Sequence, residues 1–490
     1  MNRTQRAGLL LTFFWAFADH ASRPPMAKGR DQFGQAVEAV LKREVFGPAI
    51  VAIDIRDLDT SRVLFERNST RNVKPASTMK LFTTAAALDA EGRGGATPAT
   101  TVESAGRLDG RGRLLGDVYL VGRGDPNLSD RFDRPGEKNP FDQLAADIRA
   151  SGITRIEGRL WGYDGLFSDE TIPDGWTADD LVWEYGAEVS ALSAFDNSLR
   201  LRIEAGEREG DSTQLSVQPP TDFLRIENRS VTGAAGSEAK VSLSRSLGSR
   251  RIVILGRLPL SGEAWTGAVA VPEPALFATT LLAEALARHG VSIRDDVRTS
   301  REPLPDSLRP LASVRGPAVS EQIKVVNKES QNLHAEILLR RLGLGAFKDA
   351  SVESSLRARE RFLRGRGVRL GEPAMYDGSG LSRSDLVTAR AEVDLLSAMA
   401  KHPSAGTFKD SLPIAGVDGS LKRRMVGTKA QARVFAKTGS LNHVNALAGY
   451  VDAVSGRHFV FAMIVNHYTR PSREVTDAMD EICALLAGLE

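Results

Sequence analysis

Cysteine is almost missing from this sequence, which limits how the fold can be stabilised. The single cysteine among 490 residues, Cys483, cannot form an intramolecular disulfide, and it lies in the short apolar segment 482–486. A free cysteine in such a setting usually behaves as a small buried hydrophobic side chain. We therefore expect a fold that is held together by its hydrophobic core, with Cys483 in that core.

An excess of either sign of charge is missing as well. Lys and Arg number 64 against 62 Asp and Glu, which leaves a net charge of +2. A protein whose main partner is nucleic acid normally shows a basic excess or a basic stripe, because it must neutralise phosphates. The balance therefore argues against nucleic acid as the main partner. Short basic runs such as Arg340-Arg341 are interpreted as solvated helix faces.

Long apolar runs are missing except near the N-terminus. There Arg3 and Arg6 precede a nearly continuous apolar stretch at 7–17, and small residues at 16 and 18 offer a cleavage site. This pattern is typical of a secretory signal peptide, and the stretch is too short to span a bilayer comfortably. We expect a signal peptide at 1–18 and an exported, periplasmic or extracytoplasmic chain. An uncleaved anchor, with peripheral membrane association, is the alternative.

The remaining composition is that of a globular protein, with 42% hydrophobic and 26% charged residues. A chain of 490 residues is long enough for about three domains of roughly 150 residues. Alternating or apolar runs predict strands, and apolar residues at helical spacing predict helices. At the two ends of the chain the expected strands are 49–55, 63–65, 432–437, 445–451 and 458–465, and the expected helices are 36–42, 77–88, 333–342, 352–365, 390–401 and 472–486.

The middle of the chain reads as a separate block. Strands are expected at 114–121, 156–161, 199–203 and 251–255, and helices at 141–150 and 275–288. Helices grouped against an antiparallel sheet predict an α+β fold for the two ends together. The expected domains are 19–97 with 311–490, then an inserted mixed domain at 98–198 with 268–310, and a small β-rich domain nested in it at 199–267.

Three short motifs occur in order along the chain. Ser77 and Lys80 belong to a Ser-x-x-Lys tetrapeptide, Ser330 and Asn332 to a Ser-x-Asn tripeptide, and Lys437 opens a Lys-Thr-Gly tripeptide. Together they supply a nucleophile, a nearby amine base, a proton relay and a carboxylate anchor. This is the equipment for acyl transfer through a serine ester.

The Ser77 hydroxyl is the candidate nucleophile. Residues three apart on a helix share a face, so Ser77 Oγ and Lys80 Nζ can meet if Ser77 opens the helix. Lys80 can accept the proton only when neutral, which requires a pKa lowered by burial or by a neighbouring cation such as Lys437. A helix N-terminus would also aim backbone N–H groups at a substrate carbonyl oxygen. The alternative is a surface serine beside an unrelated lysine, because such tetrapeptides are common.

The other two motifs suit substrate binding and proton transfer. Ser330 can relay a proton and Asn332 can hydrogen-bond a substrate amide, although either could simply cap the helix that follows. Gly439 would let a substrate backbone approach as an added strand, while Lys437 and Thr438 bind a terminal carboxylate. A turn without function is the alternative there. The conjunction of all three motifs in the required order favours the catalytic interpretation.

Five segments carry a family resemblance, at 74–88, 327–336, 377–383, 412–421 and 436–441. With them the chain resembles the D-alanyl-D-alanine carboxypeptidase/endopeptidases of the low-molecular-mass class C penicillin-binding proteins, from about residue 35 to the end. In that family a transpeptidase/β-lactamase-like serine acyl-transfer domain is interrupted by two further domains between the first two motifs. The long interval between Lys80 and Ser330 matches that organisation.

The resemblance implies catalytic roles for the motif residues. Ser77 is acylated by the penultimate D-alanine carbonyl of a peptidoglycan stem peptide, which releases terminal D-alanine or a cross-linked neighbour. Lys80 is the general base, Ser330 passes the proton to the leaving amine, and Asn332 holds the substrate amide. Lys437 acts in the same site. Water then hydrolyses the ester.

The resemblance also implies the binding groups. Lys437 and Thr438 bind the terminal carboxylate beside Gly439, and the N–H groups of Ser77 and Ser440 form the oxyanion hole. β-Lactams are expected to be covalent inhibitors. No metal or organic cofactor is implied, and the sequence contains no His-Glu-x-x-His motif or clustered Cys/His ligand pattern.

Two other functions stay open. A serine β-lactamase is opposed by the lack of a Glu-x-x-Leu-Asn segment and by serine at position 330, where the class C enzymes have tyrosine. A non-catalytic cell-wall peptide-binding or sensing protein is opposed by the intact Ser77 and Lys80. His334 and His443 lie beside the motifs and are interpreted as local hydrogen-bonding residues. Neither the oligomeric state nor the preference for carboxypeptidase or endopeptidase chemistry follows from the sequence.

Overall fold

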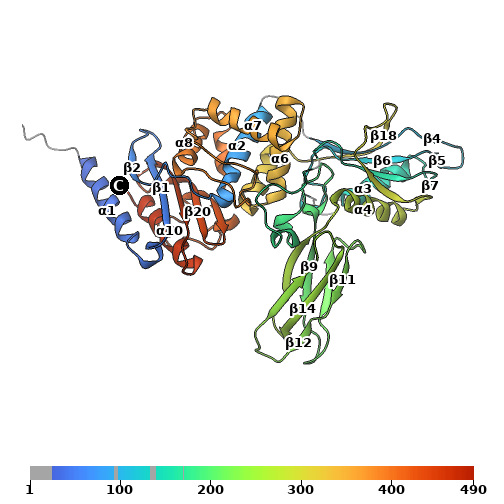
Figure 1. Ribbon diagram of the computed structural model, residues 1–490, viewed down its shortest axis with the longest axis horizontal. Coiled ribbons are helices and arrows are strands. Elements are labelled where there is room, and N and C mark those ends of the chain that lie inside the picture. The colour runs from blue at the N-terminus through green and yellow to red at the C-terminus, as the bar shows by residue number, and fades with distance from the viewer. Residues whose placement is uncertain (1–24, 93–97, 133–138, 169) are drawn as a thin grey trace, which may run out of the picture.

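The computed structural model describes residues 25–490 except 93–97, 133–138 and 169, so the expected signal peptide at 1–18 lies outside the described residues. The molecule is elongated and has three bodies (Figure 1). Both ends of the chain form one body, a mixed α/β body lies at the far end, and a narrow β body projects from between them. None of the described helices is long and apolar enough to cross a membrane.

One antiparallel sheet joins the two ends of the chain. Its strand order is β19-β20-β21-β1-β2. The N-terminal strand β1 pairs with the C-terminal strand β21, with Ile53 opposite Met463. The expected strands are confirmed, with bounds β1 Ile50–Asp57, β2 Val63–Arg67, β19 Val434–Leu441, β20 Val444–Asp452 and β21 His458–Asn466.

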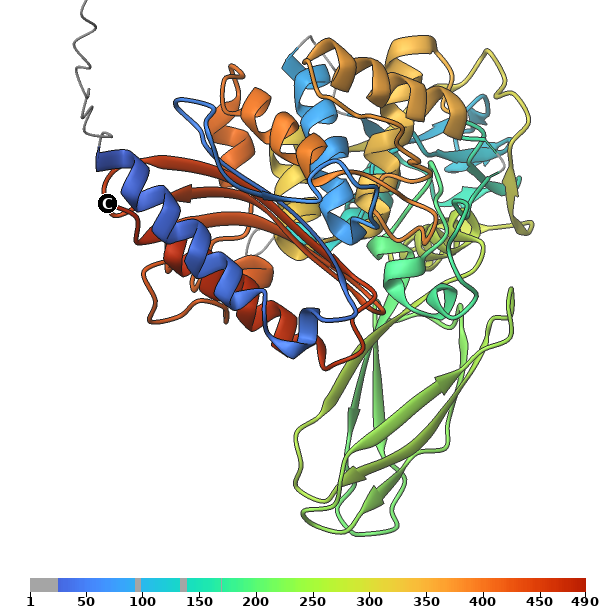
Figure 2. The same ribbon diagram turned by 60° about the vertical axis from the view of Figure 1, so that its left-hand side comes forward.

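Helices cover both faces of this sheet (Figure 2). α1 (Pro25–Val40) and α10 (Ser472–Ala487) lie side by side on one face. The other face carries the helices α2 (Met79–Gly92), α5 (Val319–Lys324), α6 (Asn332–Phe347), α7 (Val352–Gly365), α8 (Ala389–Met399) and α9 (Ala405–Asp410).

Successive side chains along each strand point alternately to the two helical layers, because the side chains of a β-strand have a period of two residues. Ile53 packs into the core under α1 and α10, whereas its neighbour Ala52 packs into the core on the side of α2. Cys483 is buried in the first of these cores, which confirms the expectation for the free cysteine.

The mixed body is built on a five-stranded sheet of order β17-β8-β6-β3-β18, with a small sheet β16-β7-β5-β4 beside it. α3 (Pro140–Ala150) and α4 (Pro274–Arg288) pack against it, close to the expected bounds. The strands are β3 Ala99–Ser104, β4 Arg107–Leu108, β5 Arg113–Leu115, β6 Val118–Val121, β7 Arg155–Ile156, β8 Leu160–Tyr163, β16 Ser292–Ile293, β17 Val297–Ser300 and β18 Arg309–Arg315.

The β body contains two small sheets of order β10-β9-β15 and β11-β14-β12, with β13 on β14. It shares one continuous apolar cluster with the mixed body, to which Leu199 and Ile252 contribute. Its strands are β9 Ser198–Glu204, β10 Gln214–Gln218, β11 Arg225–Asn228, β12 Val231–Gly233, β13 Lys240–Ser244, β14 Arg251–Pro259 and β15 Trp265–Ala270.

Several details differ from the sequence-based expectations. The strand expected at 114–121 is broken at Gly116, whose φ of 151° and close approach to Gly106 leave no room for a side chain. β18 continues to Arg315 and pairs with β3, so the return segment of the insertion extends beyond residue 310. β15 likewise continues past residue 267, to Ala270, because it completes the sheet with β9.

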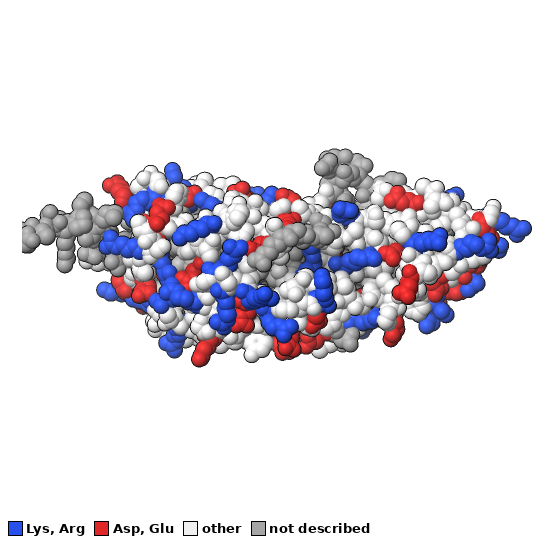
Figure 3. Space-filling model, turned by 90° about the horizontal axis from the view of Figure 1, so that it is seen from above, with Lys and Arg blue, Asp and Glu red and all other residues white. Residues whose placement is uncertain are grey.

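The basic pair Arg340-Arg341 is not a solvated face. Arg340 is buried in α6, and its guanidinium donates to Ser168 Oγ and to the Glu170 carbonyl of the insertion. Many other charged side chains do lie on the surface. Figure 3 shows Lys and Arg side chains interspersed with Asp and Glu over one whole face, without a region of a single sign.

Glu392 of α8 is buried beneath the turn that precedes α2. Its Oε1 lies within hydrogen-bond distance of Thr78 Oγ1, which also bonds to the Pro75 carbonyl at 2.8 Å. One hydroxyl hydrogen cannot serve both acceptors. The carboxyl group therefore donates to Thr78, which in turn donates to Pro75. Burial raises the pKa of Glu392 to about 8, which keeps this proton in place.

We predict that Glu392→Gln removes a pH-dependent part of the stability, because the amide donates to Thr78 and does not titrate. The pKa of Glu392 is about 8 in the folded protein and ordinarily 4.5. The wild-type contribution is therefore complete below pH 4.5 and declines as the pH rises to about 8. Melting temperatures measured between pH 5 and 8 should decline less in this variant than in wild type. The exposed Glu353→Gln is the control, and parallel curves for all three proteins would contradict the prediction.

Candidate active site

Ser77 lies in a short 3-10 turn, Ala76–Thr78, directly before α2 rather than in the α-helix itself. Two close backbone approaches shape this turn. Gly380, at a φ of 79°, lies so near Ala76 that a Cβ would fall 1.9 Å from its carbonyl oxygen. Gly439 of β19 lies against Pro75 and Ser77, where a Cβ would be 2.7 Å from the Pro75 oxygen. Glycine is therefore required on both sides of the candidate nucleophile.

Lys80, in the first turn of α2, has three partners for its fully buried amine. Its Nζ lies 2.8 Å from Ser77 Oγ, 2.6 Å from Asn332 Oδ1 and 2.7 Å from the Ser379 carbonyl oxygen. The last two atoms can only accept a hydrogen. A neutral amine has two hydrogens and one lone pair, so it can donate to both acceptors and still accept the Ser77 hydroxyl proton.

Burial lowers the pKa of Lys80 to about 7, against the opposing charges of Asp377, Glu336 and Asp385. The sequence left two causes open for such a shift, burial or the neighbouring Lys437. Desolvation is the dominant cause, and it disfavours the charged form of any amine inside the protein. A substantial share of the molecules thus carries a neutral Lys80 near pH 7.

The side chains of Ser330 and Lys437 are hydrogen-bonded to each other. Ser330 lies between the π-helical turn Val325–Glu329 and α6, with the left-handed φ of 64°. Lys437 Nζ, from β19, donates to Ser330 Oγ at 2.9 Å and to the Thr438 carbonyl at 2.9 Å. Burial, followed by the charge of Lys80, lowers the pKa of Lys437 well below its ordinary value. The second and third motifs are thereby joined by one hydrogen bond.

Asn332, the first residue of α6, links the motifs to the insertion. Its Oδ1 accepts from Lys80, and its Nδ2 donates to the Tyr185 carbonyl at 2.7 Å. An amide nitrogen has two hydrogens, so one remains to donate to a substrate carbonyl.

The edge strand β19 supplies the remaining motif residues. Thr438 Oγ1 lies 2.7 Å from Ser420 Oγ, and Ser440 Oγ donates to Asn445 Oδ1 at 2.9 Å. Of the predicted site residues, Ser77, Ser330, Asn332 and Ser440 line an open cavity of about 630 Å³. Lys80 and Lys437 lie buried behind this surface.

The structure adds residues to the site that sequence reasoning missed. Glu336, one turn into α6, accepts hydrogen bonds from the backbone N–H groups of Gly378 and Ser379 and so holds the carbonyl that binds Lys80. It lies in the segment 327–336, where the sequence analysis names Ser330, Asn332 and His334 but not Glu336. From the insertion, Asp180 and Tyr185 line the cavity, and no motif in the sequence marks them.

Comparisons with known proteins agree with this arrangement. The family model described as "D-Ala-D-Ala carboxypeptidase 3 (S13) family" matches residues 33–486. The chain is 34% identical over 464 residues to a D-alanyl-D-alanine carboxypeptidase of Actinomadura sp. (strain R39), which covers 92% of this chain and 84% of that one. It is 26% identical to the D-alanyl-D-alanine carboxypeptidase DacB of Haemophilus influenzae, over 84% and 85% of the two chains.

The fold is also that of a solved structure. Penicillin-binding protein 4 (dacB) of Haemophilus influenzae superposes with a TM-score of 0.78 at 22% identity, covering 92% of this chain and 99% of that one. A second structure of that protein, in complex with a β-lactam, superposes with a TM-score of 0.71. With its family model spanning nearly the whole length and its Ser-x-x-Lys, Ser-x-Asn and Lys-Thr-Gly residues gathered at one cavity, the chain belongs to the D-Ala-D-Ala carboxypeptidase 3 (S13) family.

Proposed function

We propose that this D-Ala-D-Ala carboxypeptidase cleaves peptidoglycan stem peptides through an acyl-enzyme on Ser77, outside the cytoplasm. The observation that carries the proposal is the set of partners of Lys80. Two pure acceptors occupy its two hydrogens, and its lone pair faces the hydroxyl of Ser77. This is the arrangement of a general base poised to activate a serine.

Acylation then follows from the positions of five residues. Lys80 takes the proton of Ser77 as Oγ attacks the penultimate D-alanine carbonyl, and the N–H groups of Ser77 and Ser440 stabilise the oxyanion. Ser330 relays the proton that Lys80 has taken up to the amine of the departing D-alanine, so the leaving group departs neutral and Lys80 returns to its neutral form. Asn332 holds the amide of the stem peptide with its free hydrogen. Water hydrolyses the ester and regenerates Ser77.

The terminal carboxylate of the substrate binds beside the edge strand β19. Lys437 and Thr438 bind the terminal carboxylate, and Gly439 lets the peptide backbone lie against the strand edge. β-Lactams carry a carboxylate and a strained amide in similar positions, so they should acylate Ser77 and hydrolyse slowly. When the leaving amine belongs to a neighbouring stem peptide, the same chemistry is endopeptidase activity.

Location and domain organisation belong to the same proposal. The positively charged and apolar segment at 1–18 directs export to the periplasm and is then removed. Residues 19–97 and 311–490 form the DD-peptidase domain, and the segment between them supplies the inserted mixed and β-rich domains. The extension of β18 to Arg315 moves the second junction by a few residues.

Ser77→Ala should lose both covalent labelling and turnover. The wild-type protein, incubated with a fluorescent penicillin, should carry one label that survives denaturation, and the variant should carry none. Purified uncross-linked and cross-linked muropeptides, followed by mass analysis, should show release of D-alanine and of separated stem peptides respectively. An unlabelled wild type that binds muropeptides unchanged would favour a binding protein, and rapid release of hydrolysed penicillin would favour a β-lactamase.

The acylation rate should depend on the protonation of Lys80. Since the pKa of Lys80 is lowered to about 7 and only the neutral amine accepts a proton, kcat/KM should rise with pH through about 7. Replacement of the exposed Lys401 by alanine, away from the cavity lining, should leave this profile unchanged. A profile that is flat between pH 5.5 and 8.5 would contradict the assignment of Lys80 as the base.

A further inference from the structure

The backbone at Ser330 needs support from its surroundings. A left-handed φ such as the 64° of Ser330 is unfavourable for a residue other than glycine and persists only where neighbouring structure holds it. Glu329 precedes it at the end of the π-helical turn, and His334 follows it in the first turns of α6. The contacts of these two flanking residues therefore help to hold Ser330, together with the hydrogen bond from Lys437 to its Oγ.

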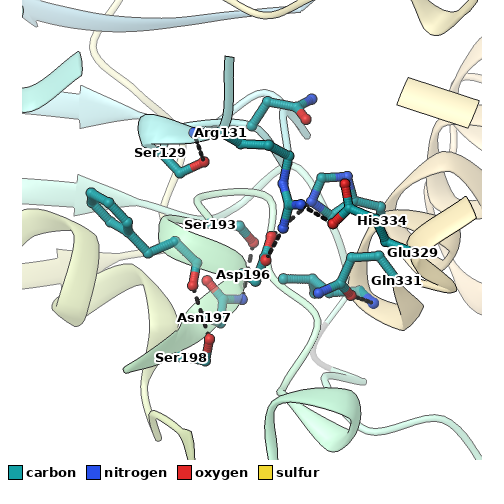
Figure 4. A network of polar contacts seen from close by, with 12 residues as sticks. Ser129, Arg131, Ser193, Asp196, Asn197, Ser198, Glu329, Gln331 and His334 are labelled. Carbon is teal, nitrogen blue, oxygen red and sulfur yellow. Dashed lines mark hydrogen bonds and ion pairs between the residues drawn. The ribbon is translucent and has the colours of Figure 1, made fainter. Parts of the chain in front are cut away.

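Both flanking residues are bound by the insertion (Figure 4). Asp196 accepts a hydrogen bond from His334 Nε2 at 2.8 Å through Oδ1, and its Oδ2 forms an ion pair with Arg131. Arg131 also forms an ion pair with Glu329. The insertion thus binds the chain on both sides of Ser330, through the Arg131 guanidinium at Glu329 and the Asp196 carboxylate at His334. We call Arg131, Asp196, Glu329 and His334 the relay clamp.

The insertion side of the clamp is stiff. Phe195, Asp196 and Asn197 all have left-handed φ values, of 48°, 56° and 50°. The Asn197 side chain supports this turn, because its Oδ1 accepts from the Ala194 N–H at 3.1 Å and its Nδ2 donates to Ser193 Oγ at 3.0 Å. A turn with three consecutive left-handed residues is unfavourable by itself, so the side-chain hydrogen bonds must maintain it.

The two halves of the clamp differ in strength. Glu329 is 53% exposed, and an ion pair that reaches the solvent contributes little. His334 has no exposed side-chain surface, and Asp196 is 17% exposed, so water competes poorly for their hydrogen bond. Although burial opposes it, the hydrogen bond from His334 and the charge of Arg131 keep the pKa of Asp196 at about 2. The carboxylate is therefore ionised at every working pH.

We propose that Asp196 and His334, with Arg131, are positioning residues for the proton relay at Ser330, so that the insertion takes part in catalysis by holding the second motif. The inference rests on the relay role given to Ser330 under the proposed function. Ser330 Oγ lies 2.9 Å from Lys437 Nζ, and a shift of the turn by an ångström breaks this hydrogen bond. Protonation of the leaving amine then slows, while Ser77 and the carboxylate site stay intact.

His334 provides a clean test, because only one of its ring nitrogens is used. Nδ1 has no hydrogen-bond partner among the residues that the structure describes, whereas Nε2 donates to Asp196. Glutamine places an N–H donor near the position of Nε2, and leucine fills the space without a donor. Loss of the donor should lower kcat, whereas KM should hardly change, because no substrate contact is lost.

The experiment measures kcat and KM for D-alanine release, with melting temperatures as a check on folding. We expect His334→Leu to lower kcat by roughly tenfold or more, with KM within about twofold of wild type, and His334→Gln to stay within about threefold in both. Asp130→Asn is the control, since Asp130 precedes Arg131 in the chain but its exposed carboxylate pairs with Arg200, which is not a clamp residue.

A double-mutant cycle with Ser330→Ala separates positioning from general destabilisation. If the clamp acts through Ser330, then His334→Leu should cause little further loss of kcat in the Ser330→Ala background. The inference is overturned if His334→Leu turns over like wild type, or if it causes the same loss with and without Ser330. Penicillin labelling of wild-type Ser77 is measured first, so a failure of the proposed function would show there, independently of the clamp.

Discussion

The constraint on which the site depends is a lysine amine without access to water. An unpaired ammonium inside a protein is costly, so Lys80 must either lose its proton or be surrounded by acceptors. The structure meets the constraint with two carbonyl-type oxygens and one hydroxyl. Each acceptor comes from a different part of the chain, since Asn332 opens α6 and Ser379 lies in the loop that Glu336 holds. The neutral amine is thus a property of the packed core around α2 and not of the Ser-x-x-Lys tetrapeptide.

The pairing of β1 with β21 brings the motifs together. Ser77 follows the first two strands, and Lys437 lies on β19, three strands away in the same sheet. Because β19 belongs to the C-terminal strands and the Ser77 turn follows the N-terminal ones, Lys437 and Ser77 come to lie at one cavity only when both ends of the chain have joined in the sheet. The insertion does not disturb this assembly, because it leaves after α2 and returns before α5, and these two helices pack against each other.

The sequence predicted regular elements well where the pattern was local. The helix at 352–365 and the C-terminal strands were found because apolar spacing and turn residues are visible in a short window. The break at Gly116 in the strand expected at 114–121 was not predicted, because it depends on the close approach of Gly116 to Gly106, which a short sequence window does not reveal. Arg340 was read as solvated because its acceptors, Ser168 and Glu170, lie far away in the chain. For the same reason the motifs predicted Ser77, Lys80 and Lys437 as site residues, whereas the contacts of Glu392, Tyr185 and Asp196 depend on partners that are distant in the sequence.

The insertion contributes directly to the cavity, which Asp180 and Tyr185 line. It contacts Asn332 of the second motif through the Tyr185 carbonyl, and it contacts His334, two residues further along α6, through Asp196. It meets the loop that binds Lys80 at a third point, where Trp176 Nε1 donates to Asp377 at 3.0 Å. Hydrogen bonds are directional and break within about an ångström of displacement. A movement of the insertion relative to the sheet would therefore change the contacts of Asn332 and His334 together with those of the loop whose Ser379 carbonyl accepts from Lys80, which couples the insertion to this side of the cavity.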